Sequence, residues 1–167
     1  MMDGDLPASP PCCPAAAGPV GAHQDLAAHG LDLMNTALQA AGPALEQHES
    51  LMVLLQQDLV RAMFAAARQP SLACLAGVCQ VALGLYVNLR SQMLLQVEAL
   101  LALLLLPLAE GRGGSGGGGA GGHHLAAALE LQQAALEGVL DFCSQPDFVR
   151  DIYLNLDCRW VAGWLGC

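Results

Sequence analysis

The side chains with the greatest chemical potential in this sequence are seven cysteines, spread widely along the chain. No two of them form a C-x-x-C pair, their number is odd, and three of them fall on apolar helical faces. This spacing predicts buried free thiols in a reduced cytosolic compartment, because zinc sites and disulfide frameworks use paired, regularly spaced cysteines. The seven are Cys12, Cys13, Cys158 and Cys167, together with Cys74, Cys79 and Cys143 on the apolar faces.

The histidines offer a second kind of metal ligand. His123 and His124 are adjacent and follow a glycine-rich stretch, but no second His or Cys pair lies at ligand spacing. His23, His29 and His48 are scattered along the chain, and we expect them to face solvent. The sequence therefore predicts no metal site and no cofactor.

Four aspartates, Asp141, Asp147, Asp151 and Asp157, lie within a short stretch of the sequence. Asp147 and Asp151 are one helical turn apart, and we expect them to share an exposed, solvated helix face. The serine, cysteine and histidine positions supply no nucleophile with a base and an orienting group beside it. The sequence thus predicts a protein that is not an enzyme.

The segment from Gly111 to Gly122 (GRGGSGGGGAGG) could suggest a phosphate-binding loop. A P-loop requires a Lys-Ser/Thr pair after the glycines and a strand before them, and this sequence has neither. We therefore predict a flexible loop between two helices.

Composition limits the fold and the partners of these 167 residues, which suffice for one domain with a modest core. Apolar residues make up 54% of the chain, mostly Leu and Ala, whereas aromatic residues make up only 4%, and this balance favours an all-α fold. The formal charge is −9, lysine is absent and the six arginines are scattered. These charges argue against nucleic-acid binding and weaken the case for direct docking on anionic lipid.

No membrane-targeting segment is predicted. The first residues are acidic and proline-rich, without the basic and apolar regions of a signal peptide. The most hydrophobic stretch, Ala99–Ala109, is interrupted by Pro107 and is shorter than the roughly 20 apolar residues that span a bilayer. It is interpreted as a buried core helix.

The hydrophobic pattern predicts three regions: a disordered Pro/Ala-rich tail at 1–22, a helical region at 23–160 and an unassigned tail at 161–167. Five helices and no strand are expected, which favours an armadillo/HEAT-like helical-repeat fold, an α-solenoid. The first helix runs from about Asp25 to Ala41 and is stopped by Gly42-Pro43. The second helix follows Ser50 as its N-cap, and the third follows Ser71 as its N-cap and bends near Asn88–Ser91. The fourth helix spans about His124–Cys143. The fifth follows Ser144 as its N-cap and has Pro146 in its first turn.

The apolar positions of each helix define its predicted buried face. In the first two helices these include Leu26, Leu33, Met34, Ala37, Leu38, Ala41, Leu51, Leu54, Leu55, Leu59, Ala62, Met63 and Ala66. In the third they include Leu72, Leu75, Val78, Cys79, Ala82, Leu83, Tyr86, Leu89, Met93, Leu94, Val97, Leu100, Leu101 and Leu104. In the fourth and fifth they are Leu125, Leu129, Leu136, Val139, Leu140, Phe148, Val149, Ile152 and Tyr153.

One motif carries a family resemblance. Asn155, Leu156, Asp157 and Cys158 follow the segment Phe148–Leu154 and resemble the box of the HUS domain (homology upstream of Sec7) of large Arf guanine-nucleotide exchange factors. The family pattern is Asn, Tyr or Leu, Asp, Cys, then usually an acidic residue. Further similarities, which extend the resemblance over about Leu26–Trp160, occur at Ala41–Pro43, Gln57–Leu59, Tyr86–Arg90, Leu95–Ala99 and Leu136–Gln145.

The form of the box is closer to the GNOM/GBF early-Golgi subfamily than to the BIG/Sec7 subfamily. The resemblance implies a regulatory segment that packs on a DCB (dimerisation) domain of the same or another chain and supports membrane recruitment and control of Sec7. It also implies Golgi recruitment proteins as partners, a cytoplasmic location peripheral to Golgi membranes, and no exchange activity in this chain, which lacks the Sec7 glutamate. Arg159, which replaces the usual acid, and the tail at 161–167 depart from the family pattern.

Two questions stay open at the level of sequence. Asn155 and Asp157 could accept hydrogen bonds from backbone amides at the end of their own helix, or could contact another domain. A generic helical-repeat adaptor, unrelated to Arf exchange factors, is the alternative to the family assignment.

Overall fold

The computed structural model describes residues 19–111 and 122–155, and the regular elements within these ranges are all helical, as predicted. The predicted flexible loop at 111–122 lies outside the described residues except for its first and last residues, and the tail at 161–167 lies wholly outside them. The elements are α1 (Pro19–Ala41), η1 (Gly42–Gln47), α2 (Glu49–Leu54), η2 (Leu55–Leu59), α3 (Val60–Ala67), α4 (Leu72–Leu100), η3 (Leu101–Leu105), α5 (Leu106–Ala109), α6 (Gly122–Cys143) and α7 (Phe148–Asn155). α1 begins at Pro19, ahead of the predicted Asp25, and includes the end of the predicted tail.

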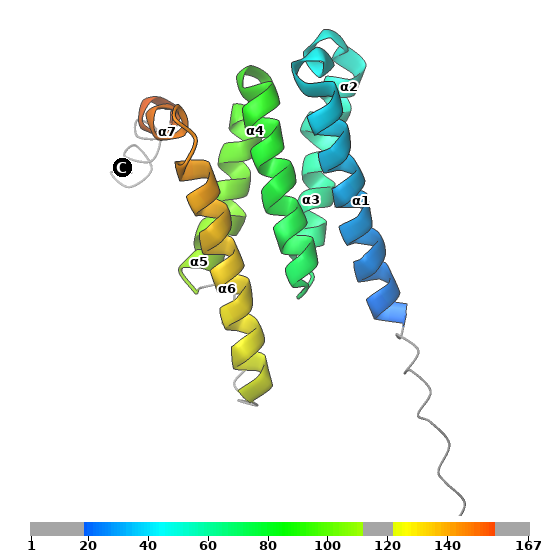
Figure 1. Cartoon of the computed structure of the whole chain (residues 1–167), viewed down its shortest axis with the longest axis vertical. Helices are drawn as coiled ribbons and strands as arrows, with labels where there is room; N and C mark the ends of the chain where they lie inside the picture. The colour runs from blue at the N-terminus through cyan, green and yellow to red at the C-terminus, as the bar shows by residue number, and fades with distance from the viewer. Residues whose placement is uncertain (1–18, 112–121, 156–167) are drawn as a thin grey trace, which may run out of the picture.

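The long third helix is divided at Leu89, inside the predicted interval. Leu89 has φ −130° and ψ 29°, outside the helical range, although its side chain is fully buried. In the turn before it, the Asn88 side-chain amide donates a 2.9 Å hydrogen bond to the Gly84 carbonyl oxygen. The chain reverses at this point, so residues 90–109 return alongside residues 72–88 (Figure 1).

The helices form two layers of alternating direction (Figure 1). Three segments run in the same direction: α1, the first half of α4 (residues 72–88) and α6 (Figure 1). For α1 and α4 the contacts show this, because Leu31 lies beside Gly77 and Leu38 lies beside Gly84. The continuous helix α2–η2–α3 and residues 90–109 run in the other direction. Stacked antiparallel helix pairs of this kind are the arrangement of an α-solenoid, in which each pair contacts its neighbours.

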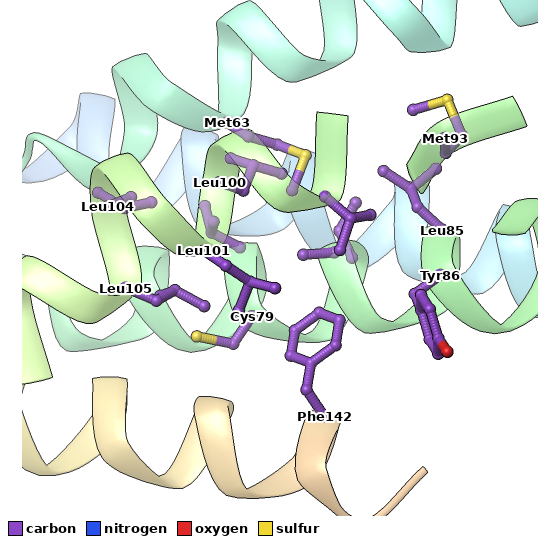
Figure 2. Packing of buried hydrophobic residues seen from close by; sticks show 14 of the residues in the cluster. Met63, Cys79, Leu85, Tyr86, Met93, Leu100, Leu101, Leu104, Leu105 and Phe142 are labelled. Atoms are coloured by element: carbon purple, nitrogen blue, oxygen red, sulfur yellow. The ribbon is translucent and has the colours of Figure 1, made fainter. Parts of the chain in front are cut away.

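The core is built on the two halves of α4. Met63 of α3 reaches this hairpin from one side and Phe142 of α6 from the other (Figure 2). Between them lie fully buried side chains of α4 and η3, each of which contributes about 1.5–3 kcal/mol of transfer free energy. These include Leu85, Leu89, Met93, Val97, Leu100 and Leu105.

The caps are partly as predicted. Gly42 ends α1 with a φ of +52°, which suits glycine, and the Ser71 hydroxyl caps α4 by accepting a bond from the Cys74 amide (3.4 Å). Ser50 does not cap the second helix, because α2 begins at Glu49 with His48 at the N-cap. Ser144 does not cap α7 either.

Ser144 donates a 2.9 Å hydrogen bond back to the Leu140 carbonyl oxygen and so extends the end of α6. α7 begins only at Phe148, so Pro146 lies in the connection and not in the first helical turn.

Several predicted core leucines are exposed, because the closest helix contacts use small residues. α6 packs on α4 through Ala135, Gly138 and Phe142, which are buried, and α1 packs through Leu31 and Leu38. Each helix carries apolar residues on more than one face, and periodicity alone does not select the packed face. The exposed residues wrongly placed in the core are Leu26, Leu33, Ala37, Leu51, Leu54, Ala62, Leu72, Leu129, Leu136, Leu140, Val149 and Tyr153.

Two helical stretches, Glu49–Ala67 and Leu72–Ala109, are long and apolar enough to cross a membrane by length and composition. The second is folded in two at Leu89, and Leu101, Leu104 and Leu105 within it belong to the core. The predicted helix at 99–109 is therefore partly buried: Leu101, Leu104 and Leu105 lie in the core, whereas Leu103 and Leu106 are exposed.

Glycine at position 138 is predicted to set the distance between α6 and α4. A Cβ atom at Gly138 would lie 2.6 Å from Cys79 Sγ, whereas a Cβ at Gly30 of α1 would meet nothing within 4 Å. We expect Gly138→Ala to lower the free energy of unfolding by about 1–3 kcal/mol through overpacking. Gly30→Ala, the matched control, should raise it by about 0.5–1 kcal/mol through helix propensity. Urea unfolding followed by circular dichroism measures both, and equal effects would contradict the close contact.

Candidate functional site

The predicted box begins at the last residue of α7. Asn155 is the final helical residue, and its side chain, like the whole of Leu156, Asp157 and Cys158, lies outside the described residues. The structure therefore leaves the roles of these four residues as predictions. What it does describe is how α7, the helix that leads into the box, is held in place.

α7 is anchored first by aromatic packing. Phe148 is buried and its ring lies 5.4 Å from Tyr86 and 5.1 Å from Phe142, measured between ring centroids. Tyr86 and Phe142 are themselves 6.0 Å apart in an edge-to-face arrangement. Because such pairs contribute about 0.5–1.5 kcal/mol each beyond their buried area, this cluster ties α7 to both α4 and α6.

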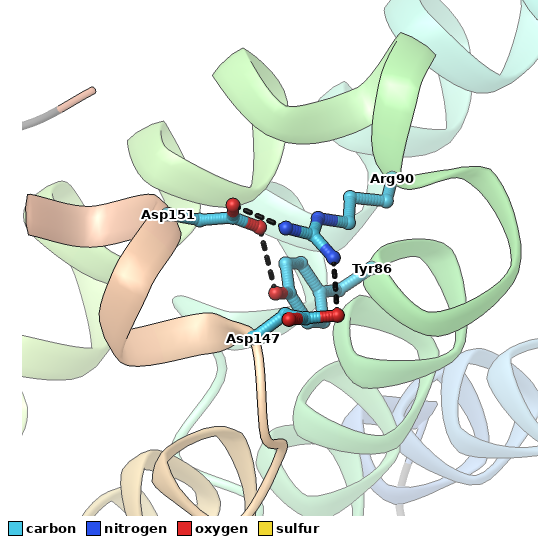
Figure 3. A network of polar contacts seen from close by, with 4 residues as sticks. All are labelled: Tyr86, Arg90, Asp147 and Asp151. Atoms are coloured by element: carbon cyan, nitrogen blue, oxygen red, sulfur yellow. Dashed lines mark hydrogen bonds and ion pairs between the residues drawn. The ribbon is translucent and has the colours of Figure 1, made fainter. Parts of the chain in front are cut away.

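The second anchor is a polar network, which we call the Asp151 clasp (Figure 3). The Tyr86 hydroxyl donates a 2.8 Å hydrogen bond to Asp151 Oδ2, and Arg90 Nη2 donates to Asp151 Oδ1. Arg90 Nη1 also donates to Asp147 Oδ2 at 2.8 Å. The Arg90 guanidinium lies 5.8 Å from the centre of the Tyr86 ring, within range of a cation–π interaction.

The clasp corrects the prediction that Asp147 and Asp151 share a solvated face. Asp151 is only 7% exposed, and α7 lies across α4 so that both carboxylates point toward Arg90 (Figure 3). The available signal was the four-residue spacing of Tyr86 and Arg90, which lie on either side of the break at Leu89, and of Asp147 and Asp151, at the start of α7. Sequence reasoning missed it, since neither spacing indicates that the two helices cross.

The protonation states of Tyr86 and Arg90 suit their roles as hydrogen-bond donors in the clasp. Burial, with the hydrogen bond to Asp151 as a second cause, raises the pKa of Tyr86 to about 12. The hydrogen bond to Asp151 also raises the pKa of Arg90 above its usual range. At neutral pH the phenol therefore stays protonated and donates, and the guanidinium stays charged.

The cysteines divide into two classes. Cys74 and Cys79 are free and buried, as predicted, whereas Cys143 is exposed and its predicted burial is wrong. Burial, followed by the nearby charge of Asp141, raises the pKa of Cys79 to about 11, so this thiol carries little thiolate at neutral pH. Cys12, Cys13, Cys158 and Cys167 lie outside the described residues.

The histidines form no cluster in the part of the chain that the structure describes. His23, His29 and His48 are exposed, as predicted. The side chains of His123 and His124 lie outside the description. Residues 19–111 and 122–155 contain no group of three or more His, Cys, Asp or Glu side chains placed to hold a metal ion.

The outward face of α6 carries a stripe of leucines. Leu129 is 55% exposed, Leu136 is 48% exposed and Leu140 is 68% exposed, and their spacing places them on one side of the helix. The opposite side, with Ala135 and Phe142, is buried against α4. We call these three leucines the α6 stripe.

We predict unequal contributions from the two carboxylates of the clasp. Asp151→Ala leaves the buried Tyr86 hydroxyl without an acceptor and should lower the free energy of unfolding by about 1–3 kcal/mol. Asp147→Ala, the matched control one turn away, removes a half-exposed carboxylate and should cost less. Urea unfolding of both variants measures the difference. A loss for Asp147→Ala as large as that for Asp151→Ala would contradict the assignment of the buried carboxylate as the anchor.

The clasp also predicts a pH dependence at high pH. The chain has two tyrosines, so a Tyr153→Phe background leaves Tyr86 alone. Its pKa of about 12 in the folded state exceeds the ordinary value of 10.0, so its contribution to stability is complete below pH 10 and is lost as pH rises toward 12. Tyrosinate absorbance should titrate near 12 in the folded protein. Titration near 10 while the helical circular dichroism is intact would exclude the buried hydrogen bond.

Comparison with known proteins assigns the family. Residues 18–162 match the family of the Mon2/Sec7/BIG1-like HUS domain. Two of the most similar relatives are the ARF guanine-nucleotide exchange factors GNOM (31% identical over 135 residues, 81% of this chain) and GNL2 (33% over 137 residues, 82% of this chain), both from Arabidopsis thaliana. No solved structure matches.

A third relative is the Golgi-specific brefeldin A-resistance guanine nucleotide exchange factor 1 homolog of Caenorhabditis elegans, 27% identical over 167 residues and 95% of this chain. The chain covers 8% of GNOM and of the Caenorhabditis protein, and 9% of GNL2. The predicted family resemblance is therefore confirmed. This chain belongs to the HUS-domain family of the Sec7-type Arf guanine-nucleotide exchange factors.

Proposed function

We propose that this chain is a non-catalytic interaction segment of a GNOM-like Arf exchange factor and acts through contacts with another helical domain. The observation that carries the proposal is the α6 stripe. A helix that is apolar on two opposite sides is expected to lie between two packed layers, and α6 has only one of them in this structure. Leu136 and Leu140 would bury their side chains against the missing layer.

The partner that fits the family is a DCB domain, in the same polypeptide or in another exchange factor chain. A helical partner can lay its own apolar stripe along α6, as helices do when they pack ridge into groove. The box residues, Asn155 to Cys158, would contribute hydrogen bonds at the end of α7. Family membership disfavours the alternative of an adaptor unrelated to Arf exchange factors.

Nucleotide exchange is proposed to reside in a Sec7 domain and not in these residues. The chain spans less than a tenth of the relatives it matches, and its match is to the HUS domain. The Tyr86 phenol and the Arg90 guanidinium of the Asp151 clasp stay protonated at neutral pH and donate hydrogen bonds, which suits a structural role. The proposed contribution of this chain is to regulate the Sec7 domain, by positioning that domain and by supporting its recruitment to membranes.

The proposed location is the cytoplasmic side of Golgi membranes, in vesicle trafficking. One relative is named as Golgi-specific, which supports the location. The net charge of −9 disfavours direct attraction to anionic lipid, so recruitment would depend on Golgi proteins.

Binding to a DCB domain from a GNOM-like factor of the same source tests the proposal. Leu136→Glu with Leu140→Glu should weaken binding by roughly tenfold or more, because a central interface contact is worth about 1–2 kcal/mol or more. Leu33→Glu on α1, which is 58% exposed, is the matched control and should bind as the unaltered chain does. Isothermal titration calorimetry measures the affinity and circular dichroism the folded state.

Asp157→Ala belongs in the same experiment, since it tests the box separately from the stripe. Reduced affinity at unchanged melting temperature would support an interdomain role for Asp157, and equal losses of affinity and stability would support a local one. Full affinity in the α6 double variant would refute the stripe as the contact surface.

A further inference from the structure

An apolar groove lies beside α7, bounded by the end of α4, η3, α5, α6 and α7, and we call it the α7 groove. Its volume is about 590 Å³, and its lining includes Ala102, Leu106, Val139, Val149 and Tyr153. Val149 and Tyr153 are 61% and 67% exposed, so the groove opens to solvent. A groove of this size and character is suited to large apolar side chains.

The α7 groove adjoins the α6 stripe. Its lining on α6 consists of Val139 and Cys143, of which Cys143 is exposed. Residues three or four apart on a helix are neighbours, so Leu136 and Leu140 of the stripe lie directly beside these two. One apolar surface therefore extends along α6 and into the groove, and a partner that covers the stripe also meets the groove.

The groove also has a charge without a counter-ion. Glu98 is the charged side chain among the described residues that line the groove, and it is half-buried. Within residues 19–111 and 122–155 no ion pair includes Glu98, and the Arg90 guanidinium is held by Asp147 and Asp151. A carboxylate that is partly removed from water is stabilised by a nearby cation. A cation on the occupant of the groove would meet that need.

We propose that the α7 groove binds an amphipathic helix of the partner protein, with large apolar side chains on one face and a lysine or arginine beside them. The inference rests on the proposed function, because this helix would reach the groove from the α6 stripe. Its apolar side chains would pack between Leu106 and Val149, and its cation would pair with Glu98. A long basic side chain fits this arrangement, since its stem can lie on apolar walls while its charged end reaches a carboxylate.

The charges favour this occupant over two others. An anionic lipid headgroup would meet the Glu98 carboxylate in a chain whose net charge is −9. A second copy of the chain would bring the same net charge, and the two copies would repel one another. A cationic helix is attracted by the same field and supplies the apolar area that the groove walls lack.

Calorimetric titration with the DCB domain at low and at high salt tests the ion pair. Glu98→Gln should weaken binding at low salt by roughly fivefold or more, and the difference from the unaltered chain should shrink at high salt. Asp32→Asn is the matched control, because Asp32 is exposed on α1, away from the groove, and this change also removes one negative charge. Equal weakening by the two changes would reduce the effect to net charge and would overturn the pairing.

The groove wall has its own test, separate from that of the stripe. Val149→Glu should weaken binding by roughly tenfold, because it places a charge where an apolar side chain would be buried. Leu103→Glu is the control, since Leu103 is 72% exposed on η3 and does not line the groove. Circular dichroism confirms that each variant is folded. Full affinity of Val149→Glu, with binding lost in the Leu136→Glu, Leu140→Glu variant, would overturn the groove and leave the proposed function intact.

Two synthetic helical peptides separate the groove from the identity of the partner. Both carry a leucine face, and one has an arginine beside it where the other has a glutamate. The arginine peptide should bind several-fold more tightly than the glutamate peptide, and Glu98→Gln should remove most of that difference, as measured by fluorescence anisotropy.

This outcome would support the groove even if the DCB domain did not bind the chain, a result that would refute the proposed function alone. Equal binding of the two peptides, or no binding of either, would overturn the inference. Binding to anionic vesicles that Val149→Glu abolishes would assign the groove to lipid instead. A dimer that the same change dissociates would assign it to a second copy.

Discussion

The reversal of the chain at Leu89 is the constraint on which the other contacts depend. Because the backbone leaves the helical range at this one residue, a stretch that would otherwise form a single long rod becomes an antiparallel hairpin. The hairpin gives both neighbours a surface: α1 and α3 pack on one side and α6 on the other. It also brings Tyr86 and Arg90, just before and just after Leu89, to the end of the molecule where α7 crosses. Without the reversal there would be neither a shared core nor a place for α7.

The crossing of α7 is then fixed by a buried carboxylate. Removing Asp151 from water is costly, and the cost is offset only when its oxygens are paired and hydrogen-bonded. The phenol of Tyr86 and the guanidinium of Arg90 fulfil that condition in the observed position of α7, since each donates to one oxygen of the carboxylate. Apolar packing of Phe148 alone would tolerate small rotations. The bonds from Tyr86 and Arg90 to Asp151 therefore set the orientation of α7, whereas the packing of the aromatic rings holds α7 against the other helices.

Helical periodicity sufficed to predict the all-α fold, the position of the break in α4 and the Ser71 cap, because these depend on local spacing and on residues with specific backbone preferences. It failed for the faces of α1 and α6, where leucines lie outward and small residues such as Gly77 and Gly138 mark the close contacts. A glycine contributes nothing to an apolar pattern, although it sets how near two helices come. The clasp was missed for a related reason: Tyr86 and Arg90 meet Asp151 only because α4 reverses at Leu89 and α7 crosses its end, and the assembled core defines that crossing.

The clasp and the α7 groove share a helix, which links them energetically. Asp151 belongs to the clasp, its neighbour Ile152 lines the groove, and Phe148 contributes to both the aromatic cluster and the groove wall. The groove has its shape only when α7 lies in the orientation that the clasp sets. Any occupant that binds this shape stabilises that orientation by mass action, and a weakened clasp lowers the occupant's apparent affinity by the same free energy. α7 thus has two different faces: one is held by charge on the side of Arg90, and the other presents exposed apolar side chains such as Val149.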